Sequence, residues 1–235
     1  MVPGIMPGRW ARTWQQRHPT TLLELVPVED ADQLTAVRAG EVQMAFVRDV
    51  EDHEGLHLIP LYAERSVVVL PREHPWAEAD ELDLADLADE HLLQDPAQVP
   101  GWADVSDEVR DGTRLVLPEM TTRQVVEVVA SGTGIVVLPM SVARLHHRKD
   151  VVAVPVTDLP EHPVGLTWPR GAEEDDPRIE DFIGVVRGRT ARSSRGTSEP
   201  APAARPRKSA RTQRSTPRPK GGRGGPSRRG GRRRG

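Results

Sequence analysis

The chain contains 235 residues, of which 37% are hydrophobic, and its formal net charge is −3. It has no cysteine, so disulfides, thiolate metal sites and cysteine nucleophiles are excluded. No stretch approaches the roughly 18 to 20 apolar residues of a membrane span, and the first six residues lack the long apolar run of a secretory signal. We therefore expect a cytoplasmic protein that does not associate with membranes.

The near-neutral net charge hides two parts of opposite sign. Residues 1–186, the acidic body, contain 15 Lys or Arg and 34 Asp or Glu, whereas residues 187–235, the basic tail, contain 17 Lys or Arg and one Glu. The basic tail has almost no large apolar side chain, so it cannot bury a hydrophobic core. We therefore predict that the tail is disordered and that the body is the folded part.

In the first 70 residues, helical and strand patterns alternate. Trp10 and Trp14 share one face of a predicted helix, and Gly40 stands where a left-handed residue would end a second helix. The predicted elements here are helices over 7–17 and from about 31 to 39, and strands over 22–26, 42–47, 56–61 and 66–70. This alternation predicts a parallel sheet with crossover helices.

The rest of the body begins with an acidic, weakly patterned stretch and continues with clearer elements. Thr121 and Thr122 are predicted to cap a helix with a Val-rich apolar stripe at 125–129. The other predicted helices cover 84–89, 139–146 and 179–186, and the predicted strands cover 91–94, 114–117, 135–138, 151–155 and 164–168.

Three motifs, in order and spacing, resemble the substrate-binding region of LysR-type transcriptional regulators. Residues 131–139 (SGTGIVVLP) are similar to the family's turn from a helix into a buried strand, residues 67–76 to its strand, turn and His-Pro segment, and residues 34–47 to its helix, glycine stop and inward strand. Turn geometry explains most of these residues without a ligand, because Gly132 and Gly134 permit a positive φ and a close backbone approach.

The resemblance covers roughly residues 2–186 and implies a fold. That fold is α/β, with two Rossmann-like lobes and a cleft between them, similar to type II periplasmic-binding proteins, followed by the disordered basic tail. The implied division is 1–64 for the first part of lobe I, 65–165 for lobe II, 166–186 for the return strand and helix of lobe I, and 187–235 for the tail.

In the family the ligand lies between the lobes, at strand ends and helix N-termini, where unpaired N–H groups favour an anionic or polar group. Arg48, after the strand ending at Val47, would hold a carboxylate bidentately or would remain a solvated surface residue. Thr121 and Thr122 would act as helix caps first and ligand contacts second. The implied ligand-binding residues are Pro3, Gly4, Ile5, Met6, Arg48, Thr121 and Thr122.

The chain departs from the family pattern at its start. LysR-type regulators place a winged helix-turn-helix and a linker helix before this region, so we expect no sequence-specific operator binding from the chain as it stands. The first strand of lobe I would retain only Met1 and Val2. Either the start codon was placed too late, or the central strand is shortened; we hypothesise that the natural protein begins a few residues upstream with an apolar strand.

The basic tail contains arginine clusters but no aromatic residue, so it offers no stacking platform for bases. Arginines of this kind neutralise phosphates in a salt-sensitive and sequence-independent way. The tail therefore either contacts nucleic acid non-specifically or serves only as a solubility tail. The candidate contact residues are Arg228, Arg229, Arg232, Arg233 and Arg234.

The motifs of the common enzyme classes are missing from the sequence. The eight histidines form no HExxH pattern, no serine stands in a GxSxG context, and the glycines complete no phosphate-binding loop. We therefore expect no catalytic activity, no metal and no cofactor.

Three functions remain open. The first is an effector-binding regulatory module that senses a small metabolite, such as a carboxylate or aromatic acid, by lobe closure. The second is an interaction protein that forms a homodimer, or a heterodimer with related regulators, while its tail contacts nucleic acid or the nucleoid. The third is a solute-binding protein of the same fold.

Overall fold

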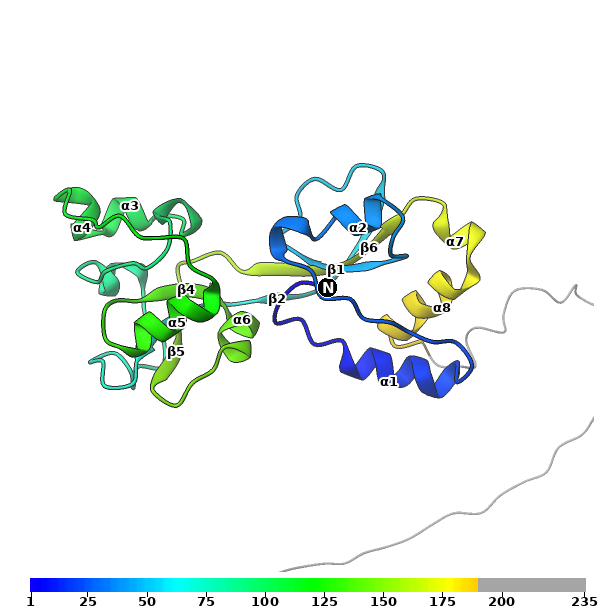
Figure 1. The fold of residues 1–235 in the computed structure, drawn as a ribbon, viewed down its shortest axis with the longest axis horizontal. Helices are drawn as coiled ribbons and strands as arrows, with labels where there is room; N and C mark the ends of the chain where they lie inside the picture. The colour runs from blue at the N-terminus through cyan, green and yellow to red at the C-terminus, as the bar shows by residue number, and fades with distance from the viewer. Residues whose placement is uncertain (190–235) are drawn as a thin grey trace, which may run out of the picture. The chain divides into compact units, whose positions relative to one another are not determined.

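The computed structural model of the protein describes residues 1–189. Within these residues six strands form two three-stranded sheets (Figure 1). The first sheet has the order β1 (Ala45–Arg48), β6 (His162–Pro169) and β2 (Leu56–Glu64), and the second has the order β4 (Val136–Pro139), β3 (Ser66–Pro71) and β5 (Val151–Pro155). The α/β class predicted from the sequence is confirmed.

The first sheet is covered by α1 (Gly8–Arg17) and α8 (Pro177–Val186). The aromatic rings of Trp14 and Phe182 meet edge to face, with centroids 5.6 Å apart, and Phe46 of β1 lies 6.2 Å from Phe182. This aromatic cluster fixes both helices on the sheet, because large rings bury much apolar area and prefer such geometry. The short elements of this lobe are η1 (Asp30–Asp32), α2 (Thr35–Arg38) and α7 (Ala172–Asp175).

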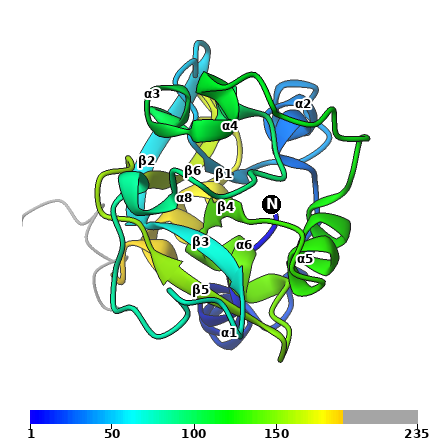
Figure 2. The same cartoon turned by 90° about the vertical axis from the view of Figure 1, so that its left-hand side faces the viewer.

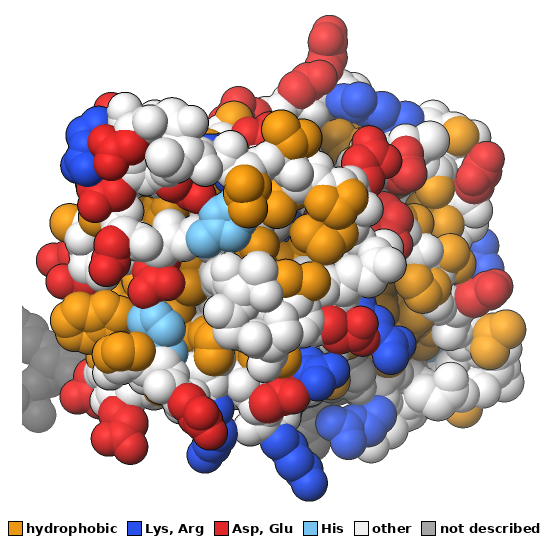
Figure 3. All heavy atoms as spheres, turned by 60° about the vertical axis from the view of Figure 1, so that its left-hand side comes forward, with side chains coloured by type: hydrophobic (Ala, Val, Ile, Leu, Met, Phe, Trp, Pro, Cys, Tyr) orange, Lys and Arg blue, Asp and Glu red, His pale blue; other side chains and the backbone are white. Residues whose placement is uncertain are grey.

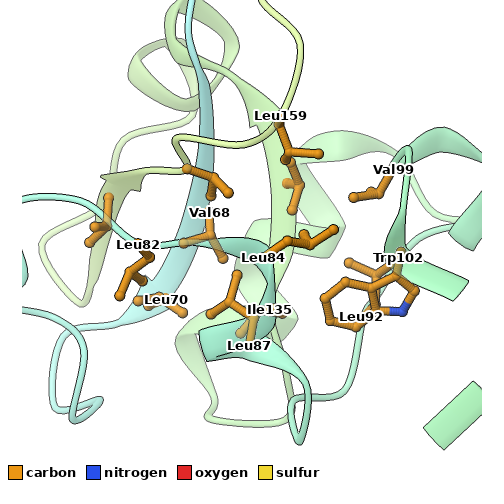
Figure 4. Close-up of a cluster of buried hydrophobic side chains, with 13 residues drawn as sticks. Val68, Leu70, Leu82, Leu84, Leu87, Leu92, Val99, Trp102, Ile135 and Leu159 are labelled. Atoms are coloured by element: carbon orange, nitrogen blue, oxygen red, sulfur yellow. The ribbon is translucent and has the colours of Figure 1, made fainter. Parts of the chain in front are cut away.

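The second sheet is buried on both faces of β3. Val67 and Val69 pack with the valines of α5 (Thr122–Ala130), whereas Val68 and Leu70 point into a cluster on the opposite face that also contains Trp102 (Figure 4). Successive strand residues point to opposite faces, so a strand buried on both sides is a continuous apolar run.

Further short elements complete the second lobe (Figure 2). Thr121 caps α5: its hydroxyl accepts a hydrogen bond from the backbone N–H of Gln124, as predicted. The remaining elements are η2 (Leu84–Leu87), η3 (Pro96–Gln98), α3 (Trp102–Val105), α4 (Asp107–Arg110) and α6 (Met140–Leu145).

The prediction that the strands form a parallel sheet is wrong for both sheets. Both sheets contain antiparallel pairs, and the parallel pairings assigned within residues 1–189 are the isolated bridges Leu82–Val156 and Leu92–Ile135. The reason is that residues 22–26 and 114–117, two of the predicted strands, have an extended or irregular course and join neither sheet. Near the first of them, two backbone hydrogen bonds connect Met1 to Val26 and Val28.

The chain passes between the two sheets twice. The first passage, through Arg65, coincides with the predicted end of the first part of lobe I at residue 64. The sequence suggested that lobe II extends to residue 165, but β6 pairs with β2 already from His162. We therefore propose that lobe I comprises residues 1–64 and 162–186, and lobe II residues 65–161.

Charged side chains are spread among apolar and other polar ones on the face that Figure 3 shows. Figure 3 shows acidic side chains scattered over one face, in keeping with the 34 acidic and 15 basic residues of the body. No helix within residues 1–189 is both long enough and apolar enough to cross a membrane. The disordered tail was predicted to begin at residue 187, but Arg187 and Arg189 donate backbone hydrogen bonds to α8, so the prediction is wrong for residues 187–189. Residues 190–235, including the tail arginines considered for nucleic-acid contact, lie outside the described residues.

Candidate functional site

The first turn of the chain packs against α6 of lobe II. Gly4 has a φ of +82°, and a Cβ atom placed on it would lie 2.5 Å from the Ser141 Oγ and 2.7 Å from the Ser141 carbonyl carbon. Both the backbone conformation and the close approach therefore require glycine. Pro3 and Gly4 thus lie where the two lobes touch.

Arg48, the last residue of β1, reaches this contact from lobe I. Its side chain is only 3% exposed, and its guanidinium donates hydrogen bonds to the Pro3 carbonyl (2.8 Å), the Ser141 hydroxyl (3.0 Å) and the Asp30 carboxylate (3.3 Å). The Arg48 Nε–H is buried and has no hydrogen-bond partner within residues 1–189. Arg48 is therefore not a solvated surface residue, and one donor remains unsatisfied.

Glu64, the last residue of β2, completes the arrangement. Its carboxylate accepts a hydrogen bond from the Ser141 hydroxyl at 2.7 Å and lies 3.6 Å from the Arg48 Nη2. The Ser141 hydroxyl thus donates to an anion of lobe I and accepts from a cation of lobe I. We call this group, consisting of Pro3, Asp30, Arg48, Glu64 and Ser141, the Arg48 cluster.

Burial shifts the pKa of Asp30, a member of the cluster, and of the nearby Tyr62. Desolvation raises the pKa of the Asp30 carboxyl, and the nearby Arg48 guanidinium opposes this rise only partly. Desolvation also raises the pKa of the Tyr62 hydroxyl, and the negative charge of Glu64 adds to that rise. Both directions are those expected when the charged form of an acid loses its hydration.

The structure separates the other predicted residues of the first turn. Ile5 is buried in the core of lobe I, whereas the Met6 side chain is 86% exposed. Neither residue belongs to the Arg48 cluster, so of the four predicted residues of this turn the structure brings only Pro3 and Gly4 together with Arg48.

Thr121 and Thr122 lie in lobe II, at the N-terminus of α5. Thr122 lines a cavity of about 800 Å³, together with Gln94 and Arg114. The Gln94 side chain accepts a hydrogen bond from the Val137 N–H at 2.7 Å, so one wall of this cavity is an edge of β4. The cavity is large enough for a small organic molecule.

Sequence reasoning did not identify Asp30, Glu64 or Ser141 as site residues. Ser141 stands two residues after Pro139 at the start of a short helix, and Glu64 ends a strand directly before the chain enters lobe II. Acidic and hydroxyl side chains at such positions are common, so these signals become specific only when the partner side chains are known. Within residues 1–189, no group of three or more His, Asp or Glu side chains lies close enough together to hold a metal ion.

The chain is similar in sequence to a known protein family and to several known proteins. The model of the LysR substrate binding domain matches residues 4–191. The Hca operon transcriptional activator HcaR of Escherichia coli K12 is 24% identical over 196 residues, which make up 81% of this chain and 64% of HcaR. A probable cat1 operon transcriptional activator of Acinetobacter lwoffii is 29% identical over 152 residues, covering 61% of this chain and 49% of that protein. The chain therefore spans about half to two thirds of the length of these relatives.

Solved structures share the fold. The BenM effector binding domain with its effector benzoate superimposes with a TM-score of 0.61 at 21% identity, covering 85% of this chain and 93% of that domain. The oxidised form of OxyR gives a TM-score of 0.61 at 22% identity, covering 80% of this chain and 92% of that structure.

Proposed function

We propose an effector-sensing role for this chain, which belongs to the LysR substrate-binding domain family. In this proposal a small metabolite binds between the two lobes and changes the balance between their open and closed arrangements. A ligand that contacts both lobes has a different affinity for the two arrangements, and this difference shifts the population.

The observation that supports this proposal best is the buried, incompletely paired guanidinium of Arg48. It extends from lobe I to Ser141 of lobe II, and its Nε–H has no partner among the residues that the structure describes. A carboxylate can accept two parallel hydrogen bonds from a guanidinium, and such pairs are stronger than hydrogen bonds between neutral groups. The Nη2 already donates to Pro3 and Ser141, so a carboxylate that binds both Nε and Nη2 has to replace one of these two contacts.

These contacts favour a small carboxylate or aromatic acid as the effector. The BenM effector binding domain has benzoate as its effector, which is consistent with this choice. We propose that Pro3, Gly4 and Arg48 form the lobe I side of the site. Ile5 and Met6 would contribute through the same turn, Thr122 through the cavity of lobe II, and Thr121 as its neighbour at the N-terminus of α5.

A thermal-shift experiment on the full chain tests the proposal. Benzoate and a panel of small carboxylates are added to the wild type and to Arg48→Lys, which keeps the positive charge but loses the Nε–H and the planar fork. At about 100 times its Kd, a true effector adds roughly 2.7 kcal/mol, and thus raises Tm by roughly 5 to 10 °C. We expect this shift in the wild type and its loss in Arg48→Lys.

The matched control is Arg65→Lys, because Arg65 is exposed and pairs with Glu81 outside the Arg48 cluster. Circular dichroism checks that each variant is folded, and calorimetric titration well below Tm measures binding directly. A panel in which no compound stabilises the wild type, or an unchanged shift in Arg48→Lys, would contradict the proposal.

A second candidate function rests on the basic tail. Its 17 Lys or Arg against one Glu favour non-specific contact with nucleic acid, in a chain that also dimerises with itself or with related regulators. The remaining proposals are a cytoplasmic location and a regulatory rather than enzymatic role. They are supported by relatives that are named as transcriptional activators.

A further inference from the structure

An apolar groove lies within lobe I, between residues 22–26 and the segment that leads into β1. It has a volume of about 330 Å³, and we call it the lobe I groove. Buried side chains of α1, α8 and the first sheet line its base; they are Trp14, Phe46, Leu166, Ile179 and Phe182. A groove of this size and lining can take up apolar side chains.

One side of the lobe I groove is the free edge of β1. Among the strands that the structure describes, β1 pairs with β6 alone. Alternate residues of an antiparallel strand direct their backbone groups to opposite sides. The Asp49 N–H donates to the Pro163 carbonyl on the side of β6, so the backbone groups of Phe46 and Arg48 are directed to the other side. Phe46 therefore presents its N–H and C=O to the groove.

A side-chain amide takes the place of a neighbouring strand beside Arg48. The Gln33 Nε2–H donates to the Arg48 carbonyl oxygen at 2.9 Å, and the Gln33 Oε1 accepts from the Arg48 N–H at 2.8 Å. A strand paired with β1 at this position would also satisfy both groups. Within residues 1–189, no backbone group bonds to Phe46 on this side, so the edge is open there.

The opposite side of the groove is the extended segment 22–26. Within the described part of the chain, the backbone groups of residues 22–25 form no backbone–backbone hydrogen bond. The side chains of Leu22, Leu25 and Val26 are 85%, 38% and 42% exposed. Exposed apolar side chains beside unpaired backbone groups are typical of an edge that accepts another strand.

Met1 shows how an extended segment pairs in this groove. Its amino group donates to the Val26 carbonyl oxygen at 2.7 Å, and its carbonyl oxygen accepts from the Val28 N–H at 3.0 Å. A residue that bonds in this way to two residues flanking its neighbour is paired in parallel. Met1 also lines the groove, so a segment joined to its nitrogen would enter the space between residues 22–26 and Phe46.

We propose that the lobe I groove is a strand-acceptor site for an apolar segment that runs directly into Met1, as the residues preceding Met1 would in a longer form of the chain. The segment has about five residues, the length of residues 22–26, with which it pairs in parallel. On its other side it meets the open edge of β1 at Phe46. All four residues of β1 are buried, so a strand beside it is buried on both faces, and a continuous run of Val and Ile fits best.

The unpaired backbone groups favour a peptide over other occupants. An apolar small molecule would fill the groove but leave donors and acceptors on both sides without partners, which is costly once water is displaced. A segment joined to Met1 has its register fixed by the chain, so it binds at a high effective concentration that a separate peptide lacks. The burial of the Met1 ammonium, which lowers its pKa, agrees with this choice, because an uncharged peptide N–H at this place has less hydration to lose.

Amide hydrogen exchange of the full chain, with and without a five-residue N-terminal extension of alternating Ile and Val, tests the proposal. The Val47 N–H faces β6 in both forms and serves as the internal reference. We expect the exchange rate of the Phe46 N–H relative to that of Val47 to fall at least about tenfold in the extended chain, because a new hydrogen bond protects Phe46. In urea unfolding, the unfolding equilibrium constant should also fall at least about tenfold.

Two control extensions of the same length separate the causes. A Gly-Ser-Gly-Ser-Gly extension lacks apolar side chains and should leave both measurements near those of the chain that begins at Met1. A proline at the third position of the Ile-Val extension removes a ladder donor and should lose most of the gain. Circular dichroism checks that each form is folded.

Three results would overturn the proposal. They are an Ile-Val extension that changes neither measurement, a Gly-Ser or proline-containing extension that matches it, and protection of Phe46 only by a separate acetylated peptide of the same sequence. None of these measurements requires an effector, so their outcome is independent of the effector screen.

Discussion

At the residue scale, the contact between the lobes depends on a glycine and an arginine. Gly4 brings the first turn to within van der Waals distance of Ser141, and Arg48 then bonds to both sides of that contact. Arg48 and Glu64 are both nearly fully buried, so removing Arg48 leaves the Glu64 charge without its cation in a poorly hydrated place, whereas removing Glu64 leaves Arg48 with Asp30 as its counter-charge. Substitutions of these residues should therefore change the stability of the contact between the lobes.

We predict that Gly4→Ala destabilises the protein by about 2 to 4 kcal/mol, because it adds both a strained φ and a steric clash with Ser141. The matched control is Gly40→Ala: Gly40 has a φ of +73° but nothing within 4 Å of its would-be Cβ. That control should lose only the conformational part, about 1 to 2 kcal/mol. Urea unfolding of both variants gives the comparison, and equal losses would show that the Ser141 contact is not tight.

At the scale of elements, the positions of the helices depend on nearby residues, whereas the formation of a strand depends on the strand with which it pairs. The predicted helix over 7–17 agrees with α1, and the predicted helix over 179–186 falls within α8. Helix periodicity, caps and glycine stops act within a few residues, so they can be predicted from the sequence. A strand forms only when it pairs with a neighbouring strand. Residues 114–117 have a suitable apolar pattern but join neither sheet.

The cap of α5 offers a test at this scale. Thr121 accepts a hydrogen bond from the Gln124 N–H, and the Gln124 side chain in turn accepts one from the Thr121 N–H. Thr121→Ala should therefore cost about 1 kcal/mol of unfolding free energy. Thr122→Ala, at the next position without a cap bond, should change stability by less than about 0.5 kcal/mol. A reversed order of the two losses in urea unfolding would contradict the assignment of the cap.

At the scale of the whole molecule, the body and the tail carry opposite charges, so we expect nucleic acid to bind the tail and an effector to bind the body. The body has an excess of acidic residues and should repel nucleic acid, whereas the tail should attract it. Phosphate neutralisation releases counterions, so the affinity of such contacts falls steeply with salt. Effector binding between the lobes should depend much less on the tail.

We predict that replacing Arg228, Arg229, Arg232, Arg233 and Arg234 with glutamine weakens retention on DNA cellulose at low salt. Each lost phosphate contact should reduce the slope of log affinity against log salt by about 0.9. The corresponding lysine variant keeps the charge and should bind nearly as the wild type, because this attraction does not depend on sequence or on guanidinium geometry. DNA retention by the glutamine variant equal to that of the wild type would assign the tail to solubility alone.

The sequence alone determined the features that arise from neighbouring residues. These are the separation of acidic body and basic tail, the α/β class, the cap at Thr121, and the glycine and proline punctuation that resembles the LysR family. Each depends on the conformational preference or the charge of residues close together in the chain, so it can be identified before the fold is known.

Only the tertiary structure decided which side chains meet where the two lobes touch. Arg48 and Ser141 are 93 residues apart, and Asp49 and His162 are 113 apart. The same holds for the antiparallel pairing of both sheets, because strand direction depends on which edges come together. Contacts of this range arise from the packing of whole elements, and the polar partners of a buried group are therefore determined only when those elements are in place.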